Sequence, residues 1–400
     1  MSGYRPEGGA GGAGVLGGAG GAGGAGGAGG AGGAGGAGGA GGAGGAGGAG
    51  VARWYGGYGT PLMTNALVTN RDGIAGDWLG ALFEGNQFAL ETPGHLIRWE
   101  PWVRAAILDF DLLSHMHFSW HNESNQESFS LWHTEMDNTV TPPTAACGRI
   151  VTLIRPDEAV FESQLALVEG YADLREDRAG EVVAQLGPCI AFWSSIVNLH
   201  PDHKRWTLEL VDVALRFANL VEMRFKHALA CRRPVELSPQ IQPMILTPGH
   251  GAFPSGHATE AFMLAYLLWE LVPDITNAWC EQLMRQAARI AINRTVAGVH
   301  FPVDSAAGQL LGLTLAEYFM HRCRPADDDE AVFYPWRFDG TRFQPAAGPA
   351  ADFNWRQLYD APNGTRLIAP FTDWIDLEPM NTQSSALLRW LWDMAAQEWT

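Results

Sequence analysis

The first fifty residues limit the fold of this chain most strongly, because they cannot contribute to a packed core. From Gly8 to Gly50 the sequence is almost wholly a Gly-Gly-Ala repeat, broken only near Val15 and Leu16. Such small residues bury little apolar surface, and ordering them costs much conformational entropy. A collagen-like helix would need proline in the repeat. Residues 1–50 are therefore predicted to be a disordered tail.

The rest of the chain is predicted to form three segments. Residues 51–150 are rich in Gly, Pro, Asn, Asp and Trp, and we expect irregular structure with short helices, forming the N-terminal part of a catalytic domain. Residues 151–325 carry helical patterns and are expected to be its core. Residues 326–400 are expected to be a C-terminal extension packed on that core. Because no βαβ alternation appears, the predicted fold class is all-α, a helical bundle.

Long amphipathic helices are the basis of that prediction. One apolar stripe recurs at helical spacing and ends beside Lys226; it consists of Leu208, Val211, Leu215, Ala218, Val221 and Phe225. A second helix is expected from Ala258 to Leu271, and a third carries Leu283, Ala287 and Ile290. Arg233-Pro234 is expected to terminate the first of these helices and to open a loop that leads to the second.

Charge and cysteine usage exclude several classes of partner and compartment. The net charge of −17 and the pI near 5.1 argue against nucleic acid as a partner. Five scattered cysteines suit reduced thiols better than a disulfide framework. No apolar segment follows the N-terminus, and the best apolar stretch, Ala261 to Val272, is short and contains Glu270. We expect a cytoplasmic protein with no membrane span, and the architecture allows a homodimer.

Three short motifs in the middle of the chain bring oxyanion-binding side chains together. In the first, six residues separate Lys226 from Arg233-Pro234. The second is Pro254-Ser255-Gly256-His257. The third runs from Asn293 to Asp304 and includes Arg294, Gly298 and His300. An oxyanion is bound by fixed cations, directed donors and imidazoles, and the three motifs contain all of them.

The spacing assigns a role to each residue type. Ser255 and Gly256 fall at a predicted helix start, where free N–H groups and the helix dipole favour an anion. His300, held by Asp304, is suited to be a neutral ligand or nucleophile, and His257 a general acid–base. The alternatives are surface salt bridges for the cations, an ordinary helix cap for Ser255, and satisfied core histidines.

The order and spacing of these motifs resemble the superfamily of vanadium-dependent haloperoxidases and type-2 phosphatidic acid phosphatases. For a haloperoxidase, the resemblance implies that His300 of this chain binds vanadate and that His257 transfers the protons of peroxide. It also implies that five further residues hold the vanadate oxygens. These five are Lys226, Arg233, Ser255, Gly256 and Arg294. In the phosphatases, the resemblance implies that His300 attacks phosphorus and that His257 protonates the leaving alcohol, with no cofactor.

Other positions bear on which reaction is catalysed. His250 matches a position that faces vanadate and is His in bromide-type haloperoxidases; the alternative is an exposed loop histidine. Two positions depart from the haloperoxidase pattern, with Met223 in place of Trp and Asn293 in place of Ser. A separate cluster of His115, His117 and His121 has metal-compatible spacing, but a surface or packing role is expected for it.

The resulting functional prediction is a vanadium-dependent haloperoxidase that oxidises halide, with bromide favoured, by hydrogen peroxide, and acts on a small organic acceptor. The alternative is an acid phosphatase that hydrolyses phosphate monoesters through a phosphohistidine. A third hypothesis, a structural protein without chemistry, predicts that site residues are missing, whereas all are present.

Overall fold

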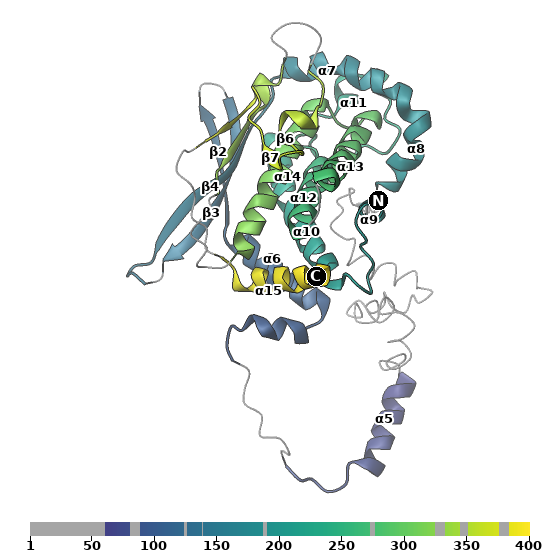
Figure 1. Ribbon diagram of the computed structural model, residues 1–400, viewed down its shortest axis with the longest axis vertical. Coiled ribbons are helices and arrows are strands. Elements are labelled where there is room, and N and C mark those ends of the chain that lie inside the picture. The colour runs from purple at the N-terminus through teal and green to yellow at the C-terminus, as the bar shows by residue number, and fades with distance from the viewer. Residues whose placement is uncertain are drawn as a thin grey trace, which may run out of the picture. The chain divides into compact units, whose positions relative to one another are not determined.

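The computed structural model describes residues 61–80, 89–123, 126–137, 139–186, 190–272, 277–324, 333–344, 351–375 and 384–400. The tail predicted at residues 1–50 lies outside these ranges. The described residues belong to two units, one ending at Trp99 and the other extending from Glu100 to Thr400 (Figure 1). In the first unit the structure describes helix α5 (Pro61–Ile74) and the 3₁₀ helix η2 (Pro93–Arg98).

The second unit contains the long helices. Its α-helices are α6 (Pro101–Ser114), α7 (Glu158–Gly170), α8 (Arg175–Ala184), α9 (Ile190–Ser194), α10 (Arg205–Leu229), α11 (Pro234–Leu237), α12 (Gly256–Leu271), α13 (Asn277–Val296), α14 (Pro302–Cys323) and α15 (Ala386–Ala396). Its 3₁₀ helices are η3 (Tyr171–Leu174), η4 (Pro239–Ile241), η5 (Gly340–Arg342), η6 (Trp355–Gln357) and η7 (Gln397–Trp399).

Helix α14 lies at the centre of this unit. Almost every residue of it is buried, because α10, α12, α13 and the sheet all pack around it. All six residues of the apolar stripe predicted on α10 are buried as well. Helix α8 packs on α13, on the side away from the sheet (Figure 1).

Helices α12 and α14 approach each other unusually closely. A Cβ atom at Gly308 would lie 2.6 Å from the carbonyl oxygen of Ser255, and one at Gly312 would overlap the carbonyl oxygen of Thr259. Only glycine at both positions lets the two backbones meet in this way. The contact brings the first turn of α12 against the second and third turns of α14.

The predicted all-α class is wrong, because the second unit also contains β-sheet. Strands β2 (Met116–Glu123), β3 (Gln126–Asp137), β4 (Thr144–Ile154), β5 (Trp336–Asp339) and β8 (Thr372–Trp374) form one sheet in the order β2-β3-β4-β5-β8. β4 and β5 pair in parallel, and the other neighbours are antiparallel. Strands β6 (Tyr359–Asp360) and β7 (Thr365–Arg366) form a second sheet.

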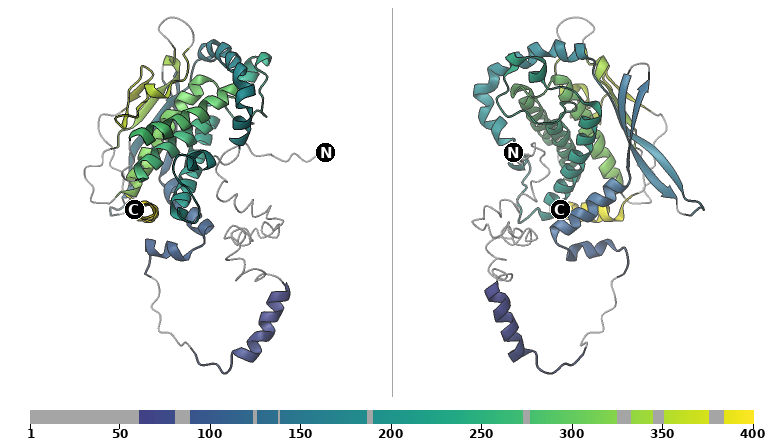
Figure 2. Two further views of the ribbon diagram at one scale, coloured as in Figure 1. Left: turned by 45° about the vertical axis from the view of Figure 1, so that its right-hand side comes forward. Right: turned by 180° about the vertical axis from the view of Figure 1, so that it is seen from behind.

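The sheet packs on one side of the helices, as both views of Figure 2 show. Phe118 and Phe129 stack with ring centroids 5.4 Å apart, and both meet the edge of Phe225 on α10. The sequence hides these strands because buried positions on β3 hold polar Ser130 and His133, which interrupt the apolar alternation. Ser130 bonds Thr152 on β4 at 2.7 Å, so burial of its hydroxyl is tolerated.

The C-terminal segment packs on the same core. Helix α15 contacts α10 and α14, and the Glu398 carboxylate accepts the backbone N–H groups of Trp206 and Thr207, each at 2.8 Å. A carboxylate at the start of α10 accepts from N–H donors that have no intrahelical partner, and its negative charge interacts favourably with the helix dipole. Across the described ranges, none of the helices combines the length and the apolar character needed to cross a bilayer.

Candidate active site

Four helix ends meet near α7 and α11 (Figure 1). Helices α10 and α13 end here, and α12 and α14 begin here. Ala230, in the left-handed conformation, terminates α10, while Ser255 is the N-cap of α12 and Pro302 opens α14. Two helix starts with positive dipole ends therefore lie beside basic residues from two helix C-termini, which favours an anion.

Lys226 and Arg233 bring fixed positive charge into this site. Lys226 is buried in the last turn of α10 and donates to the carbonyl oxygens of Pro254 and Ala252. Burial lowers the pKa of Lys226, and the nearby Glu222 carboxylate opposes that shift. Burial also lowers the pKa of Arg233 to about 10, which leaves it protonated at neutral pH. The bonds from Lys226 thus tie the last turn of α10 to the loop that leads into α12.

The hydrogen bonds of His300 define its tautomer. Its Nε2 lies 3.0 Å from an Arg233 nitrogen, and a guanidinium can only donate, so Nε2 carries the lone pair. Nδ1 therefore holds the proton and donates to Asp304 Oδ2 at 2.9 Å. Burial, followed by the charges of Arg233 and Lys226, lowers the pKa of His300 well below its usual value. The site thus presents a neutral imidazole with a directed lone pair beside a cation.

Asp304 fixes this geometry from the first turn of α14. Its Oδ2 also accepts the Phe301 backbone N–H at 2.9 Å, and its backbone carbonyl accepts the Ser255 N–H at 2.9 Å. The carboxylate therefore orients the His300 ring, while the backbone holds the two helix starts together. Burial raises the pKa of Asp304, and the bond from Phe301 and the charge of Arg233 oppose the shift.

Ser255 and Gly256 form the start of α12. The Ser255 Oγ accepts the Ala258 N–H at 3.5 Å, a long N-cap contact that leaves its own hydrogen for donation. Gly256 occupies the first helical position, where a backbone N–H has no intrahelical partner. Both can donate to an anion.

His257 and Arg294 are connected through Gln185, at the end of α8. The Gln185 carbonyl lies 3.0 Å from His257 Nε2, and a carbonyl only accepts, so Nε2 carries the proton and Nδ1 the lone pair. Arg294 donates to Gln185 Oε1 at 3.0 Å and to the Val182 carbonyl at 3.1 Å. Desolvation, followed by the Arg294 charge, lowers the pKa of His257 to about 3. His257 is therefore neutral and basic at Nδ1.

His250 contacts the same guanidinium as His300. Its Nδ1 lies 3.1 Å from an Arg233 nitrogen, which can only donate, and 3.2 Å from the Gly251 carbonyl oxygen, which can only accept, so these two contacts do not fix the tautomer of the ring. Burial, with the charges of Lys226 and Arg233, lowers the pKa of His250 to about 4. His250 thus lies at the oxyanion-binding residues and is only partly exposed.

The structure brings together all nine residues singled out from the sequence, and sequence reasoning missed two more. Glu222, one turn before Lys226, is buried with its carboxylate against Gly256, where a Cβ atom would overlap it. Burial raises the pKa of Glu222, with Lys226 and Arg233 opposing. An acidic residue inside an apolar helical stripe is the signal that could have identified it.

The second missed residue is Gln185, which lies far from the motifs in sequence. It also accepts from Asn293 at 3.0 Å, so Asn293 reaches the site through this buried amide. Sequence spacing contains no signal for Gln185, because its role depends on the packing of α8 against α13.

Comparisons with known proteins bear on these residues. Residues 210–327 match the family model of the PAP2 superfamily, and this range includes all three motifs. No match is found among curated proteins. A similar solved structure is the first transmembrane PAP2 type phosphatidylglycerolphosphate phosphatase from Bacillus subtilis. It is 21% identical, with 42% of this chain and 89% of that chain covered, at a TM-score of 0.33.

Proposed function

We propose that this chain, a member of the PAP2 superfamily, is a vanadium-dependent haloperoxidase. Its motifs predicted the superfamily, and the match of residues 210–327 to the family model confirms it. The proposed reaction is the oxidation of halide, bromide in the first instance, by hydrogen peroxide, with a small organic molecule as the halogen acceptor. The superfamily includes both haloperoxidases and phosphatases, so the choice between them rests on the site residues.

The observation that carries the proposal is the lone pair on His300 Nε2 beside Arg233, at 3.0 Å. One neutral imidazole beside the charges of Arg233 and Lys226, with Arg294 acting on His257, fits an oxyanion that takes a single histidine ligand. When bound, vanadate supplies the Lewis-acidic centre at which hydrogen peroxide is activated. In this proposal Asp304 keeps the lone pair of Nε2 aimed at the ligand, and the three cations, Ser255 Oγ and Gly256 N–H compensate the oxygens.

His257 supports peroxide chemistry through its protonation state. Accepting a proton from hydrogen peroxide requires a neutral ring with a lone pair, and the bond from Nε2–H to Gln185 leaves that lone pair at Nδ1. The lowered pKa of His257 favours this starting state. Negative charge on a bound anion raises that pKa, so the ring can retain a proton once the oxyanion is present.

Phosphate-monoester hydrolysis is the second candidate, and the same His300 lone pair favours it. Nε2 is a suitable nucleophile toward phosphorus, with three cations to compensate the phosphoryl oxygens. His257 would then have to be protonated to deliver a proton to the leaving alcohol. We place this function second because His250, whose position is His in bromide-type haloperoxidases, lies beside Arg233 at the same residues.

The deciding experiment compares both reactions on one purified sample. Bromide, hydrogen peroxide and a phenolic dye are supplied with and without orthovanadate, beside an assay with p-nitrophenyl phosphate. Vanadate-dependent bromination that phosphate inhibits competitively is the expected result. Hydrolysis that vanadate inhibits, without bromination, would establish the phosphatase instead.

A further inference from the structure

We propose that His115, His133 and Glu135 bind a divalent transition-metal cation, best matched by zinc, at a structural site separate from the oxyanion site. The three residues come from two elements of the second unit. His115 follows the last residue of α6, and His133 and Glu135 lie two apart on β3, so their side chains share one face of the strand.

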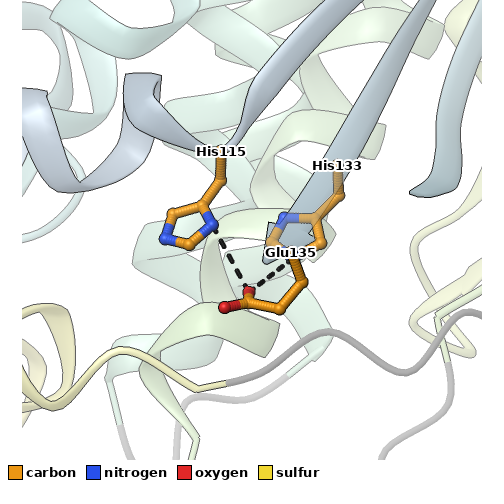
Figure 3. A group of neighbouring side chains, drawn as sticks. All are labelled: His115, His133 and Glu135. Atoms are coloured by element: carbon orange, nitrogen blue, oxygen red, sulfur yellow. Dashed lines mark ion pairs between the residues drawn. The ribbon is translucent and has the colours of Figure 1, made fainter. Parts of the chain in front are cut away.

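One oxygen of Glu135 is the focus of the cluster (Figure 3). His115 Nδ1 lies 3.4 Å and His133 Nε2 3.3 Å from the same Oε2 atom, and the two dashed lines meet there. The imidazole rings are nearly parallel, with centroids 5.2 Å apart. One ligand atom from each of the three residues lies within 4.8 Å of the other two.

These separations match ligands that share one cation. Zinc bonds to histidine nitrogen and carboxylate oxygen at about 2.0–2.1 Å, which places tetrahedral ligand atoms roughly 3.3 Å apart. Direct hydrogen bonds at the same positions would be shorter, at about 2.9 Å. The 3.3 and 3.4 Å separations from Oε2 therefore correspond to two edges of a coordination tetrahedron.

Two buried atoms of the cluster have no hydrogen-bond partner. His133 Nε2 and Glu135 Oε2 face each other without meeting hydrogen-bond geometry. An unsatisfied buried acceptor costs about 1–3 kcal/mol and calls for a specific explanation. A cation between the two atoms would satisfy both.

Tyr318 provides a second-sphere contact to the cluster. Its hydroxyl lies 2.8 Å from His133 Nδ1, the ring nitrogen opposite the proposed metal bond. If Nδ1–H donates to this hydroxyl, Nε2 is left with the lone pair that a metal requires.

His115 has the freedom to complete the site. Its Nδ1 also lies 3.1 Å from the Thr134 carbonyl, so ligation through this atom exchanges that hydrogen bond for a metal bond. The side chains of His115 and Glu135 are 22% and 25% exposed, which gives solvent access for the ion and for a water ligand. Arg322 is the nearby opposing charge, and Asp111 pairs with it at 3.5 Å.

The position of the cluster indicates a structural role. Through Tyr318 it reaches the C-terminal half of α14, whose first turn carries Asp304. At a rise of about 1.5 Å per residue the two positions are roughly 21 Å apart along that helix. A bound cation would connect the end of α6, strand β3 and helix α14 without touching the oxyanion.

The test measures zinc binding to the purified full-length protein. After removal of metals with a chelator, zinc is titrated by calorimetry in a buffer that does not coordinate or precipitate zinc, and metal content is measured after dialysis. We expect one equivalent of tightly bound zinc and an increase in melting temperature. Tyr318→Phe should weaken zinc about 10–100-fold, the effect typical of a lost second-sphere contact.

Partly exposed ligands provide variants that should still fold. Glu135→Gln and His115→Ala are each expected to weaken zinc more than Tyr318→Phe and to remove the zinc-dependent increase in melting temperature. His121→Ala, an exposed histidine on β2, is the matched control and should bind zinc as the wild type does. Zinc binding that is absent in the wild type, or unchanged in Glu135→Gln, would overturn the proposal.

Discussion

Two histidine–carboxylate pairs in this molecule have similar chemistry and opposite surroundings. His300 Nδ1 and Asp304 bond at 2.9 Å, and the other ring nitrogen, Nε2, lies beside the cationic side chain of Arg233. His133 and Glu135 are 3.3 Å apart, and their facing atoms lack hydrogen bonds. In the first pair the Asp304 carboxylate binds Nδ1 and so orients the ring with Nε2 toward the ligand. In the second pair the Glu135 carboxylate faces Nε2, the nitrogen that would itself bind the metal.

Under the two proposals, neighbouring charge and geometry decide which ion such a pair binds. A histidine suits an anionic ligand when a carboxylate fixes one ring nitrogen and a guanidinium faces the other, as at His300. A histidine and a carboxylate that both present lone pairs to one point suit a cation. The predictions below test whether the two regions are independent.

The largest expected effect comes from His300→Ala. Loss of the ligating or nucleophilic nitrogen should reduce both bromination and phosphate-ester hydrolysis by at least about 10³-fold. Zinc affinity and the circular dichroism spectrum should be unchanged, because the pair on β3 lies elsewhere. Wild-type activity in this variant would contradict the role of His300, and loss of zinc binding would contradict the independence of the regions.

Arg233→Lys should have the next largest effect, about 10²-fold in kcat/KM. The guanidinium contacts His250 through Nε and Nη2, and Val299 and His300 through Nη1, and an ammonium cannot reproduce that planar arrangement. Arg232→Lys is the matched control, since Arg232 is exposed and pairs with Glu158 at the surface. Equal activities of the two variants would show that Arg233 supplies charge alone.

Gly312→Ala should separate α12 from α14 and lower the free energy of unfolding by about 1–3 kcal/mol. The added Cβ would overlap the Thr259 carbonyl, a backbone atom that cannot move by itself. Gly180→Ala is the control, because Gly180 on α8 has open space around its Cα and should be neutral or slightly stabilising. Denaturant titration measures both, and vanadate binding should weaken only in Gly312→Ala.

The smallest expected effect is that of Glu222→Gln, about tenfold in anion affinity. The neutral acid does not repel an anion, so as pH rises through its raised pKa, ionisation of Glu222 should weaken binding in the wild type. Gln cannot ionise, so the variant should bind phosphate more tightly than the wild type at pH 8 and equally at pH 5. A ratio of affinities that does not change with pH would exclude Glu222 from the anion site.

Prediction from sequence succeeded where the signals were local. The apolar stripe of α10 and the start of α12 near Ser255 follow from helical period and capping rules. Each depends on residues within one or two turns of each other. The motif residues could therefore be assigned to helix ends, and the N-terminal ends, such as that of α12, favour anions.

Non-local features could not be predicted in this way. Strand β5 pairs with β4 although Trp336 and Val151 are far apart in the sequence, and buried Ser130 and His133 concealed the alternation of β3. The tertiary structure also decided which histidines cluster. His115 was considered with His117 and His121, but it meets His133 and Glu135 instead, and the other two are exposed.

By itself, the sequence determined the residues of the candidate oxyanion site and the superfamily that residues 210–327 match, because motif spacing and helix periodicity are properties of short stretches of chain. Only the tertiary structure decided that Glu222 and Gln185 belong to that site and that a sheet covers the helices. Side chains brought together by packing acquire their tautomers, charges and partners from neighbours distant in sequence, and these are set when the chain folds.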